Sequence, residues 1–215
     1  MCNKYTLRVG LHDKKSKLLV DICNQSAQDN QKIDLHSLSG ILPNDNAPAL
    51  MMFNRQATAV SMRWGFSAKG GKLIINARIE NVKDRITFKG LVDHQRCALP
   101  ASGYYEWRDG DNLRHFIQRE DGQDFYLAGL YRSDEHGRLH FVVLTRAAYG
   151  PHAKIHPRMP CILNSREEAR RWISGAMPIE SFQTNDFAAL SIEVQGPDQL
   201  MMDFCDAFNP SKNAP

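Results

Sequence analysis

Apolar and polar residues alternate along this chain with two different periods, and each period predicts one kind of element. Between Lys14 and Gln28, the apolar residues Leu18, Leu19 and Ile22 recur at helical spacing among lysines and polar residues. A helix with one apolar side lies on the surface of a protein and turns that side inward. We therefore expect a surface helix over residues 14–28.

Two further helices are expected near the end of the chain. Ser165 and Glu168 form a capping box, in which each side chain accepts a hydrogen bond from the other residue's free backbone N–H. Trp172 supplies an apolar side chain to this helix, and Gly175 ends it, because glycine adopts the left-handed conformation that commonly follows a helix. The other helix is expected from Ile179 to Leu190.

The middle of the chain has the composition of short strands. Aromatic and β-branched residues, which favour extended structure, dominate six segments: Thr58–Trp64, Arg96–Pro100, Gly103–Arg108, Arg114–Arg119, Phe125–Tyr131 and Leu139–Thr145. Tight turns are expected at Asp109-Gly110, Asp121-Gly122 and His136-Gly137. Short strands joined by hairpins form a largely antiparallel sheet, so the pattern predicts an α+β protein with helices at the margins.

Composition indicates a folded protein in a reducing compartment. The chain has 215 residues, of which 42% are hydrophobic, and this is enough to form the core of one large domain. The five cysteines form no close pair and no Cys-x-x-Cys, which argues against a disulfide framework and a four-cysteine zinc site: Cys2, Cys23, Cys97, Cys161 and Cys205. The chain shows no signal peptide and no apolar run of the roughly 20 residues that a membrane helix requires. We expect a soluble cytoplasmic protein without a membrane partner.

The net charge permits DNA binding but does not require it. The charge is +3 and the isoelectric point is near 8.6, below the value of about 9 that marks a nucleic-acid-binding domain by composition alone. If DNA is the partner, the basic side chains must gather in one place.

Cys2 is the first candidate for chemistry. Its small side chain suits removal of Met1 by an aminopeptidase, which would leave an amine and a thiol on adjacent carbons. Such a pair captures an aldehyde, because the amine forms an imine and the thiol then closes a thiazolidine ring. An α-amino group titrates near about 7.7–8.0, so much of it is a neutral nucleophile in the cell. The alternative is that a cysteine stands at this position by chance.

Two segments predicted to be extended carry further candidates. Glu106 lies between large aromatic residues, where partial desolvation would raise the pKa of its carboxyl and suit it to proton donation; the alternative is a strand residue that points outward. Asn76, Arg78 and Glu80 share one face of an extended segment. Asn76 can orient the terminal amine and Arg78 can clamp a phosphate, or Arg78 can form an ordinary surface salt bridge with Glu80.

A loop near residue 156 holds a histidine between prolines. His156 is fixed by Pro157 and Pro160, which suits a catalytic imidazole, although a single loop histidine is more often structural. His152 and Cys161 lie close in the sequence, but the prolines prevent helical spacing and no fourth ligand is evident, so no metal site is expected.

Trp64 is the last candidate. It precedes Gly65, and an exposed tryptophan there offers a platform for a nucleobase, worth roughly 1–3 kcal/mol per stacked base. A tryptophan buried in the core at a strand end is the alternative.

In this order, the segments resemble the SRAP family, the SOS response-associated peptidases or abasic-site-processing proteins. The resemblance spans about three quarters of the chain, and its most specific strings are a cysteine at position 2, Gly-Tyr-Tyr-Glu-Trp and His-x-Arg-Met-Pro. The matching segments are Met1-Cys2, the Pro43 region, Trp64-Gly65-Phe66, residues 76–80, residues 96–107, residues 127–131, Thr145 and residues 156–160.

The resemblance implies both a fold and a function. The fold would be a single domain over residues 1–215 of mainly antiparallel β-sheets in a barrel-like arrangement with few peripheral helices, a DNA channel, and a tail of about fifteen residues. The function would be to sense abasic sites in single-stranded DNA and to form a covalent thiazolidine cross-link through Cys2, with lyase and autoproteolytic activity. No cofactor is implied, and we expect a monomer.

The resemblance also implies roles for particular residues. Asn76 would position the N-terminus and the sugar, Glu106 would shuttle protons, and His156 would promote imine formation or resolution of the link. The residues that would contact DNA are Lys4, Trp64, Arg78, Thr145 and Arg158.

Some positions depart from the family pattern. Asn3 and Lys4 stand where the family usually has Gly-Arg, and Pro157 stands where Asp is frequent. Asn tolerates positive φ better than most residues, whereas Lys lacks the bidentate fork of Arg. The segment before Pro43 also lacks a common Asn. These departures place the chain on a divergent branch.

Two other functions remain open at this stage. A cysteine peptidase would use Cys2 as nucleophile, His156 as base and Asn76 as orienting group. A DNA-binding module without covalent chemistry would use basic and aromatic residues alone and would bind single strands with and without abasic sites equally.

Overall fold

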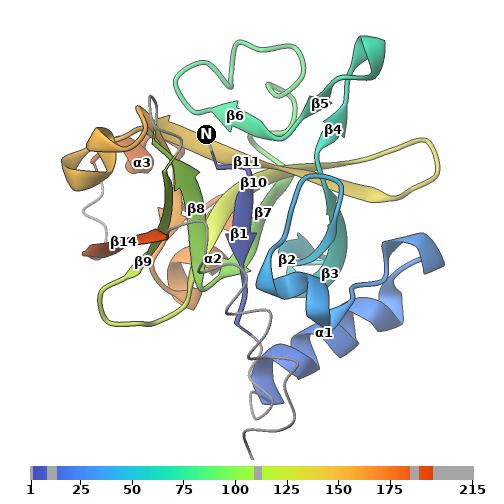
Figure 1. Cartoon of the computed structure of the whole chain (residues 1–215). Helices are drawn as coiled ribbons and strands as arrows, with labels where there is room; N and C mark the ends of the chain where they lie inside the picture. Colours follow the sequence, from blue (N-terminus) through green and yellow to red (C-terminus); the bar gives the residue numbers. More distant parts are fainter. Residues whose placement is uncertain (1, 9–13, 109–112, 185–188, 196–215) are drawn as a thin grey trace, which may run out of the picture.

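A computed structural model describes residues 2–8, 14–108, 113–184 and 189–195, and sheets dominate it (Figure 1). One sheet has four strands in the order β1-β8-β9-β14, and every pairing within it is antiparallel. These strands are β1 (Lys4–Thr6), β8 (Gly103–Trp107), β9 (Arg114–Arg119) and β14 (Leu190–Gln195).

The larger sheet has eight strands. Its order is β12-β11-β3-β2-β7-β10-β13, and β6 pairs with β11 beside this path. The strands are β2 (Asn46–Phe53), β3 (Gln56–Trp64), β6 (Asn76–Arg78), β7 (Arg96–Ala101), β10 (Phe125–Ser133), β11 (Leu139–Ala147), β12 (Arg158–Pro160) and β13 (Ile162–Leu163). A third sheet pairs β4 (Phe66–Ser67) with β5 (Leu73–Ile74).

Pairing in the larger sheet forms a closed circuit. β11 pairs with β3, β3 with β2, β2 with β7, β7 with β10, and β10 again with β11. The α+β class with dominant sheets agrees with the sequence analysis, whereas the barrel-like overall arrangement stays a prediction. β11 is parallel to both β3 and β6, so the sheet is mixed rather than purely antiparallel.

All six strands expected from the sequence exist, with ends within two residues of the expected ones. The turns at Gly122 and Gly137 have positive φ values of 68° and 75°, which glycine adopts without strain. The expected turn at Asp109-Gly110 lies outside the described residues, as does the expected C-terminal tail.

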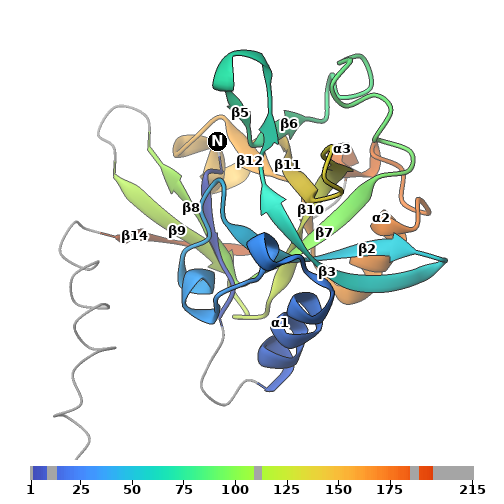
Figure 2. The ribbon, with the colours of Figure 1, turned by 90° about the vertical axis from the view of Figure 1, so that its right-hand side faces the viewer.

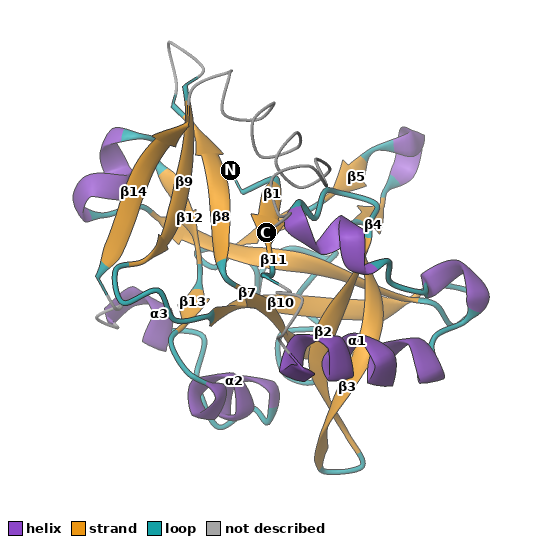
Figure 3. Cartoon of the chain, turned by 60° about the horizontal axis from the view of Figure 1, so that its bottom comes forward, coloured by secondary structure: helices purple, strands orange, loops and turns teal. Residues whose placement is uncertain are grey.

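The helices lie at the margins of the sheets (Figure 3). α1 (Lys14–Ser26) packs on β3 and β2 (Figure 2). It buries Val20 and Cys23, whereas Leu18 and Ile22 are 59% and 40% exposed. The helix was therefore predicted correctly, but its inward face is rotated from the one expected.

α2 (Arg166–Ile173) has a modified capping box. The Ser165 hydroxyl accepts a hydrogen bond from the Glu168 N–H at 3.1 Å, as predicted. The Glu168 carboxylate accepts from the Asn164 N–H at 2.8 Å, one residue before the predicted donor. Gly175 follows the helix with φ 82°. The helix packs on β7 and β10.

The third expected helix, from Ile179 to Leu190, is confirmed only in part. Among the described residues α3 covers Ser181–Thr184, residues 185–188 of the expected helix lie outside the described ones, and Leu190, its expected last residue, begins strand β14. The six residues of β14 pair with β9, so at Leu190 pairing across the sheet takes the place of the expected helix end. The 3-10 helices are η1 (Asp29–Gln31), η2 (Leu35–Ser39), η3 (Lys69–Gly71) and η4 (Gly150–Lys154).

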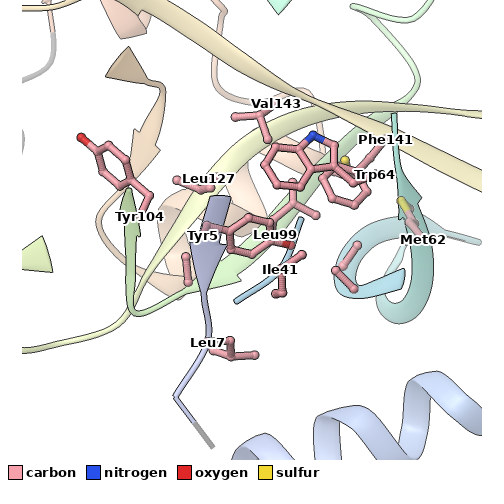
Figure 4. Packing of buried hydrophobic residues seen from close by; sticks show 14 of the residues in the cluster. Tyr5, Leu7, Ile41, Met62, Trp64, Leu99, Tyr104, Leu127, Phe141 and Val143 are labelled. Atoms are coloured by element: carbon pink, nitrogen blue, oxygen red, sulfur yellow. The ribbon is translucent and has the colours of Figure 1, made fainter. Parts of the chain in front are cut away.

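The main apolar core lies where the two large sheets meet (Figure 4). The indole of Trp64 stacks on Phe141, with ring centres 5.9 Å apart, and meets the edge of Tyr5 at 5.3 Å. Tyr5 belongs to β1, so this cluster fixes the beginning of the chain against the larger sheet. Among the described residues, no helix is long and apolar enough to span a bilayer.

Candidate functional site around Cys2

Cys2 lies at the centre of a group of polar side chains. It is fully buried, with its Sγ 3.8 Å from the Lys4 carbonyl oxygen. Burial raises the pKa of the Cys2 thiol far above its usual range, and the negative charge of Glu106 acts in the same direction. The thiol is therefore protonated at neutral pH, with a carboxylate as an electrostatic neighbour.

Asn76 holds the backbone of Cys2. Its Nδ2 donates a hydrogen bond to the Cys2 carbonyl oxygen at 2.8 Å. Its Oδ1 is buried and meets no hydrogen-bond partner among the described residues. β6 carries Asn76 to this place because it pairs with β11, where Asn76 lies opposite Val143. The structure therefore brings together two residues that are 74 positions apart in the sequence.

Glu106 points into the protein. It is 1% exposed, whereas its neighbours Tyr105 and Trp107 are only half-buried, so the outward alternative is wrong for its position. Side chains alternate along a strand, and Tyr104 therefore shares the inner face with Glu106. Burial raises the pKa of the Tyr104 hydroxyl well above its usual value, and Cys2 and Glu106 add to this effect.

His152 borders the same group, and His156 lies four residues further along the chain. The ring of His152 lies 5.8 Å from that of Tyr104 and is 2% exposed. Burial lowers the pKa of His152 from 6.5 to about 4, and the charges of His156 and of the amino terminus contribute in the same direction. The Nδ1 of His156 lies 3.0 Å from the Arg158 backbone N. η4 thus places the imidazole of His152 against Tyr104, and His156 follows it in the loop that leads to β12.

Trp64 and Thr145 are not at the surface. Trp64 is fully buried, and its Nε1 donates to the Ile75 carbonyl oxygen at 3.0 Å. Thr145 is also fully buried, within β11. Neither side chain reaches solvent, so neither can contact DNA in this conformation. For Trp64 the core alternative is correct, because its indole fills the space between β1 and the larger sheet.

The charged residues of the segments 76–80 and 156–160 pair differently from expectation. The Arg158 guanidinium forms two hydrogen bonds with the Glu80 carboxylate, at 2.6 and 2.9 Å, and a third to the Thr145 carbonyl oxygen at 2.7 Å. Arg158 therefore links β12 to the segment after β6, and its charge is compensated. The salt bridge between Arg78 and Glu80, which was the alternative interpretation of Arg78, does not form, because Glu80 pairs with Arg158. Arg78 is exposed, and among the described residues it has no side-chain hydrogen bond or ion pair.

A basic and aromatic patch lies on the outer face of β8. The Lys4 Nζ lies 4.9 Å and the Arg114 guanidinium 5.2 Å from the centre of the Tyr105 ring. Lys4 and Tyr105 are directly paired across β1 and β8, so they share a face. Burial, followed by the charge of Arg114, lowers the pKa of Lys4. This patch of two cations and a half-buried aromatic ring thus begins at Lys4, two residues after Cys2.

Sequence reasoning missed Tyr104, His115 and the position of His152. The period of two along Gly-Tyr-Tyr-Glu-Trp would have placed Tyr104 on the face of Glu106. His115 lies opposite Glu106 across β8 and β9 and is 3% exposed; only the strand register reveals it. His152 was considered solely as a metal ligand, although it directly borders the site.

Solved structures show the same fold. A protein from Bacteroides thetaiotaomicron superimposes with a TM-score of 0.69 at 20% identity, covering 93% of this chain and 94% of that chain. A phage-related protein from Bordetella bronchiseptica gives a TM-score of 0.67 at 20% identity, covering 90% and 94%. At this level of identity, the likeness concerns the fold alone.

Curated relatives share a common name. The abasic site processing protein YMR114C of Saccharomyces cerevisiae is 33% identical over 121 residues, which are 50% of this chain and 32% of that protein. The abasic site processing protein YedK of Escherichia coli is 37% identical over 107 residues, which are 46% and 47%. These matches span less than half of either relative. The abasic site processing protein YobE of Bacillus subtilis is 26% identical over 81% of this chain and 82% of its own length.

The family is shown by a match that covers nearly the whole described chain. The model of the SOS response associated peptidase (SRAP) family matches residues 1–194. This range includes Cys2, Asn76, Glu106 and His156, together with every strand except the last residue of β14. The chain therefore belongs to the SRAP family.

Proposed function

We propose that this protein captures abasic sites in single-stranded DNA through a covalent bond to Cys2. A role in processing abasic-site DNA follows from the family and from the names of its relatives. The single observation that carries the covalent step is the position of Cys2, with its carbonyl held by Asn76 and its thiol next to Glu106.

The proposed reaction begins with the amine. Removal of Met1 converts the Cys2 nitrogen into an α-amino group, which attacks the aldehyde of the ring-opened deoxyribose. The resulting carbinolamine takes a proton on its oxygen and loses water, and an imine forms. The thiol sulfur then adds to the imine carbon, and its proton passes to the nitrogen. The product is a thiazolidine, and one water molecule is released in all.

The side chains around Cys2 suit these steps. Glu106 is the proposed proton shuttle, because the carbinolamine oxygen must gain a proton and the thiol must lose one. Asn76 is the proposed positioning residue for the amine and the sugar. His156 is proposed to assist imine formation or resolution of the link. A thiol that stays protonated fits this order of events, in which the amine reacts first.

The burial of Cys2 adds a condition to the proposal. The thiol is fully covered in a chain that carries Met1. The proposed function therefore requires that loss of Met1 both frees the amine and opens a path to the thiol. Protein that retains Met1 should be inactive toward abasic DNA.

The same environment weighs against a cysteine peptidase of the papain kind. Such an enzyme needs a thiolate paired with an imidazolium. Here burial and Glu106 oppose ionisation of the Cys2 thiol. Lyase activity remains part of the proposal as a later event at the same residue, whereas autoproteolysis would remove Met1 before the reaction begins.

Adduct formation tests the proposal. Protein without Met1 is mixed with single-stranded DNA that carries one abasic site, and the product is resolved on a denaturing gel. We expect a shifted band for the wild type and for Cys23→Ala, a matched variant of another buried cysteine. Cys2→Ala should give no stable adduct, because only a reversible imine can form. A full adduct with Cys2→Ala, or none with the wild type, would refute the covalent mechanism.

A further inference from the structure

A pocket of about 210 Å³ lies beside the site and has no part in the reaction proposed above. Its lining comes from η4 and the residue before it, from Met159 in β12, from the residue after β9 and from the beginning of β14. Most of its lining is apolar or aromatic: Tyr149, Pro151, Met159, Leu190 and Ile192, with Ala189 beside them.

One buried polar side chain lines this pocket. His152 is 2% exposed, and neither of its ring nitrogens makes a hydrogen bond of ordinary geometry among the described residues, although backbone groups of His156 and of His152 itself are close enough to raise its pKa. A buried polar group without a partner is costly, so its presence calls for a ligand or a function. Its lowered pKa, about 4, keeps the imidazole neutral at pH 7, and a neutral imidazole offers one donor and one acceptor.

The pocket and Cys2 are neighbours through a single pair of rings. His152 packs on Tyr104 with ring centres 5.8 Å apart. Tyr104 in turn lies in the electrostatic surroundings of Cys2 and Glu106. A ligand in the pocket would therefore lie next to whatever is bound at Cys2.

Size and lining indicate an aromatic ring system. A cavity of about 150 Å³ with apolar walls holds benzene, so 210 Å³ is enough for a flat heteroaromatic ring. Tyr149 supplies an aromatic wall, and Met159 and Ile192 supply apolar contacts. A nucleobase combines a flat face with donors and acceptors at its edge, and the two nitrogens of His152 match that edge.

The charges at the rim fit a DNA strand. The Arg146 guanidinium lies 5.0 Å from the centre of the Tyr149 ring, and Tyr149 is 41% exposed. A cation there can neutralise a backbone phosphate of a nucleotide whose base enters the pocket. Glu120 also lines the pocket, and its carboxylate can accept a hydrogen bond from an exocyclic amino group of a base.

We propose that this pocket receives the nucleobase of the nucleotide adjoining the abasic residue, with His152 hydrogen-bonded to the base edge. The inference rests on the proposed function, because that function supplies DNA as the ligand. The pocket would hold the strand in register, so that the baseless sugar stops at Cys2 while its neighbour is anchored. Since a neutral imidazole can both donate and accept, the pocket detects the presence of a base more than its identity.

Non-covalent binding tests the pocket separately from the chemistry. Labelled single strands carry a central tetrahydrofuran residue, which lacks the aldehyde and cannot react. In two further strands, a second tetrahydrofuran replaces the nucleotide on the 5′ or the 3′ side. Dissociation constants are measured by fluorescence anisotropy with the Met1-free protein. For the wild type, removal of one of these two bases should weaken binding about 5- to 150-fold, the equivalent of roughly 1–3 kcal/mol per stacked base.

Pocket variants locate the effect. Ile192→Trp fills the pocket, so the penalty for deleting the base should disappear. Val194→Trp adds the same ring to the same strand at a residue that does not line the pocket, and it should keep the penalty. His152→Leu should reduce it. If Ile192→Trp fails to fold by circular dichroism, Leu190→Phe takes its place in the same measurement.

The outcomes separate the two proposals. The pocket proposal is overturned if the wild type tolerates both base deletions, or if the filled variants keep the full penalty. An adduct with true abasic DNA and no base penalty would refute the pocket and leave the proposed function standing. A base penalty without any adduct would leave the pocket as a binding site and refute the covalent function.

Discussion

A buried thiol beside a carboxylate keeps its proton, and this simple fact determines how Cys2 can react. Burial and Glu106 both raise the pKa of the thiol, so the sulfur is a poor first nucleophile. An α-amino group ionises near neutrality instead. The residue is therefore suited to a reaction in which nitrogen attacks first and sulfur second.

At the residue scale, Asn76 is the sharpest target. Asn76→Ala removes the 2.8 Å hydrogen bond to the Cys2 carbonyl oxygen and leaves that oxygen without its donor, at a cost of roughly 1–3 kcal/mol. We expect the rate constant of adduct formation to fall about 5- to 150-fold, as measured by single-turnover kinetics on denaturing gels.

A matched asparagine controls for stability alone. Asn46→Ala removes two hydrogen bonds, to the carbonyl oxygens of Asn30 and Lys32, and neither bond involves Cys2. It should lower the melting temperature without changing the adduct rate. Equal loss of rate in both variants would show that Asn76 acts only through folding.

His152 predicts a pH dependence of stability. Its pKa is about 4 in the folded protein and 6.5 when exposed, so between these values the unfolded chain binds a proton that the folded chain does not. Stability from this residue is complete above pH 6.5 and is lost as the pH falls toward 4, by about 3 kcal/mol at most. Urea denaturation from pH 7.5 to 4.5 measures this slope.

The experiment must show that the change of stability with pH comes from His152. Other carboxylates also destabilise the protein in acid, so the comparison is between variants. His152→Leu should flatten the slope between pH 6.5 and 4.5, whereas the exposed His36→Leu should retain it. The idea fails if His152→Leu and the wild type lose stability in parallel.

Sequence reasoning at this scale identified the right residue types but not all of their surroundings. Cys2, Asn76 and Glu106 do lie together. They could be identified from the sequence because the motif and the alternation along the strands both indicated them. Arg158 was expected to face DNA, yet Glu80 neutralises it. That partner comes from a segment 78 positions away, which no local pattern reveals.

At the element scale, the strands rich in aromatic and β-branched residues were predictable from the sequence. Two other strands, β2 and β14, were not. β2 (Asn46–Phe53) contains two alanines, two methionines and a proline, and none of these signals a strand. Only the first residue of β14, Leu190, fell within the expected helix, and the rest of the strand was not predicted, because its residues are ordered by pairing with β9. Long-range pairing, rather than local propensity, creates both strands.

The cap of α2 offers an element-scale prediction. Ser165→Ala removes the hydroxyl that accepts from the Glu168 N–H, and the loss of an N-cap costs about 1 kcal/mol. We expect the urea midpoint to fall, with an unchanged adduct rate, since α2 packs on β7 and β10 away from Cys2.

Glu167→Ala serves as the comparison for this helix. Glu167 lies exposed in the same first turn, and its side chain makes no cap. Its effect on the midpoint should be smaller than that of Ser165→Ala. A larger effect would mean that charge at the helix start, rather than the hydroxyl, stabilises this end.

At the scale of the whole molecule, the fold gathers the ends of distant segments around the beginning of the chain. β1 lies on the edge of the four-stranded sheet, β6 reaches it through β11, and η4 follows β11 directly. β11, which belongs to the closed circuit of paired strands, connects two of these elements, β6 and η4, to the larger sheet. The sequence indicated the class and the family, whereas this convergence depends on the register of strands far apart in the chain. That the whole chain is one domain stays a prediction.

Intact mass spectrometry is the most direct test of the central claim. The protein is weighed before and after incubation with a single-stranded oligonucleotide that contains one abasic site. We predict a starting mass lower than that of the full sequence by one methionine residue. After incubation, the mass should increase by that of the oligonucleotide less one water. A starting mass that retains Met1, or an unchanged mass after incubation of Met1-free protein, would contradict the account.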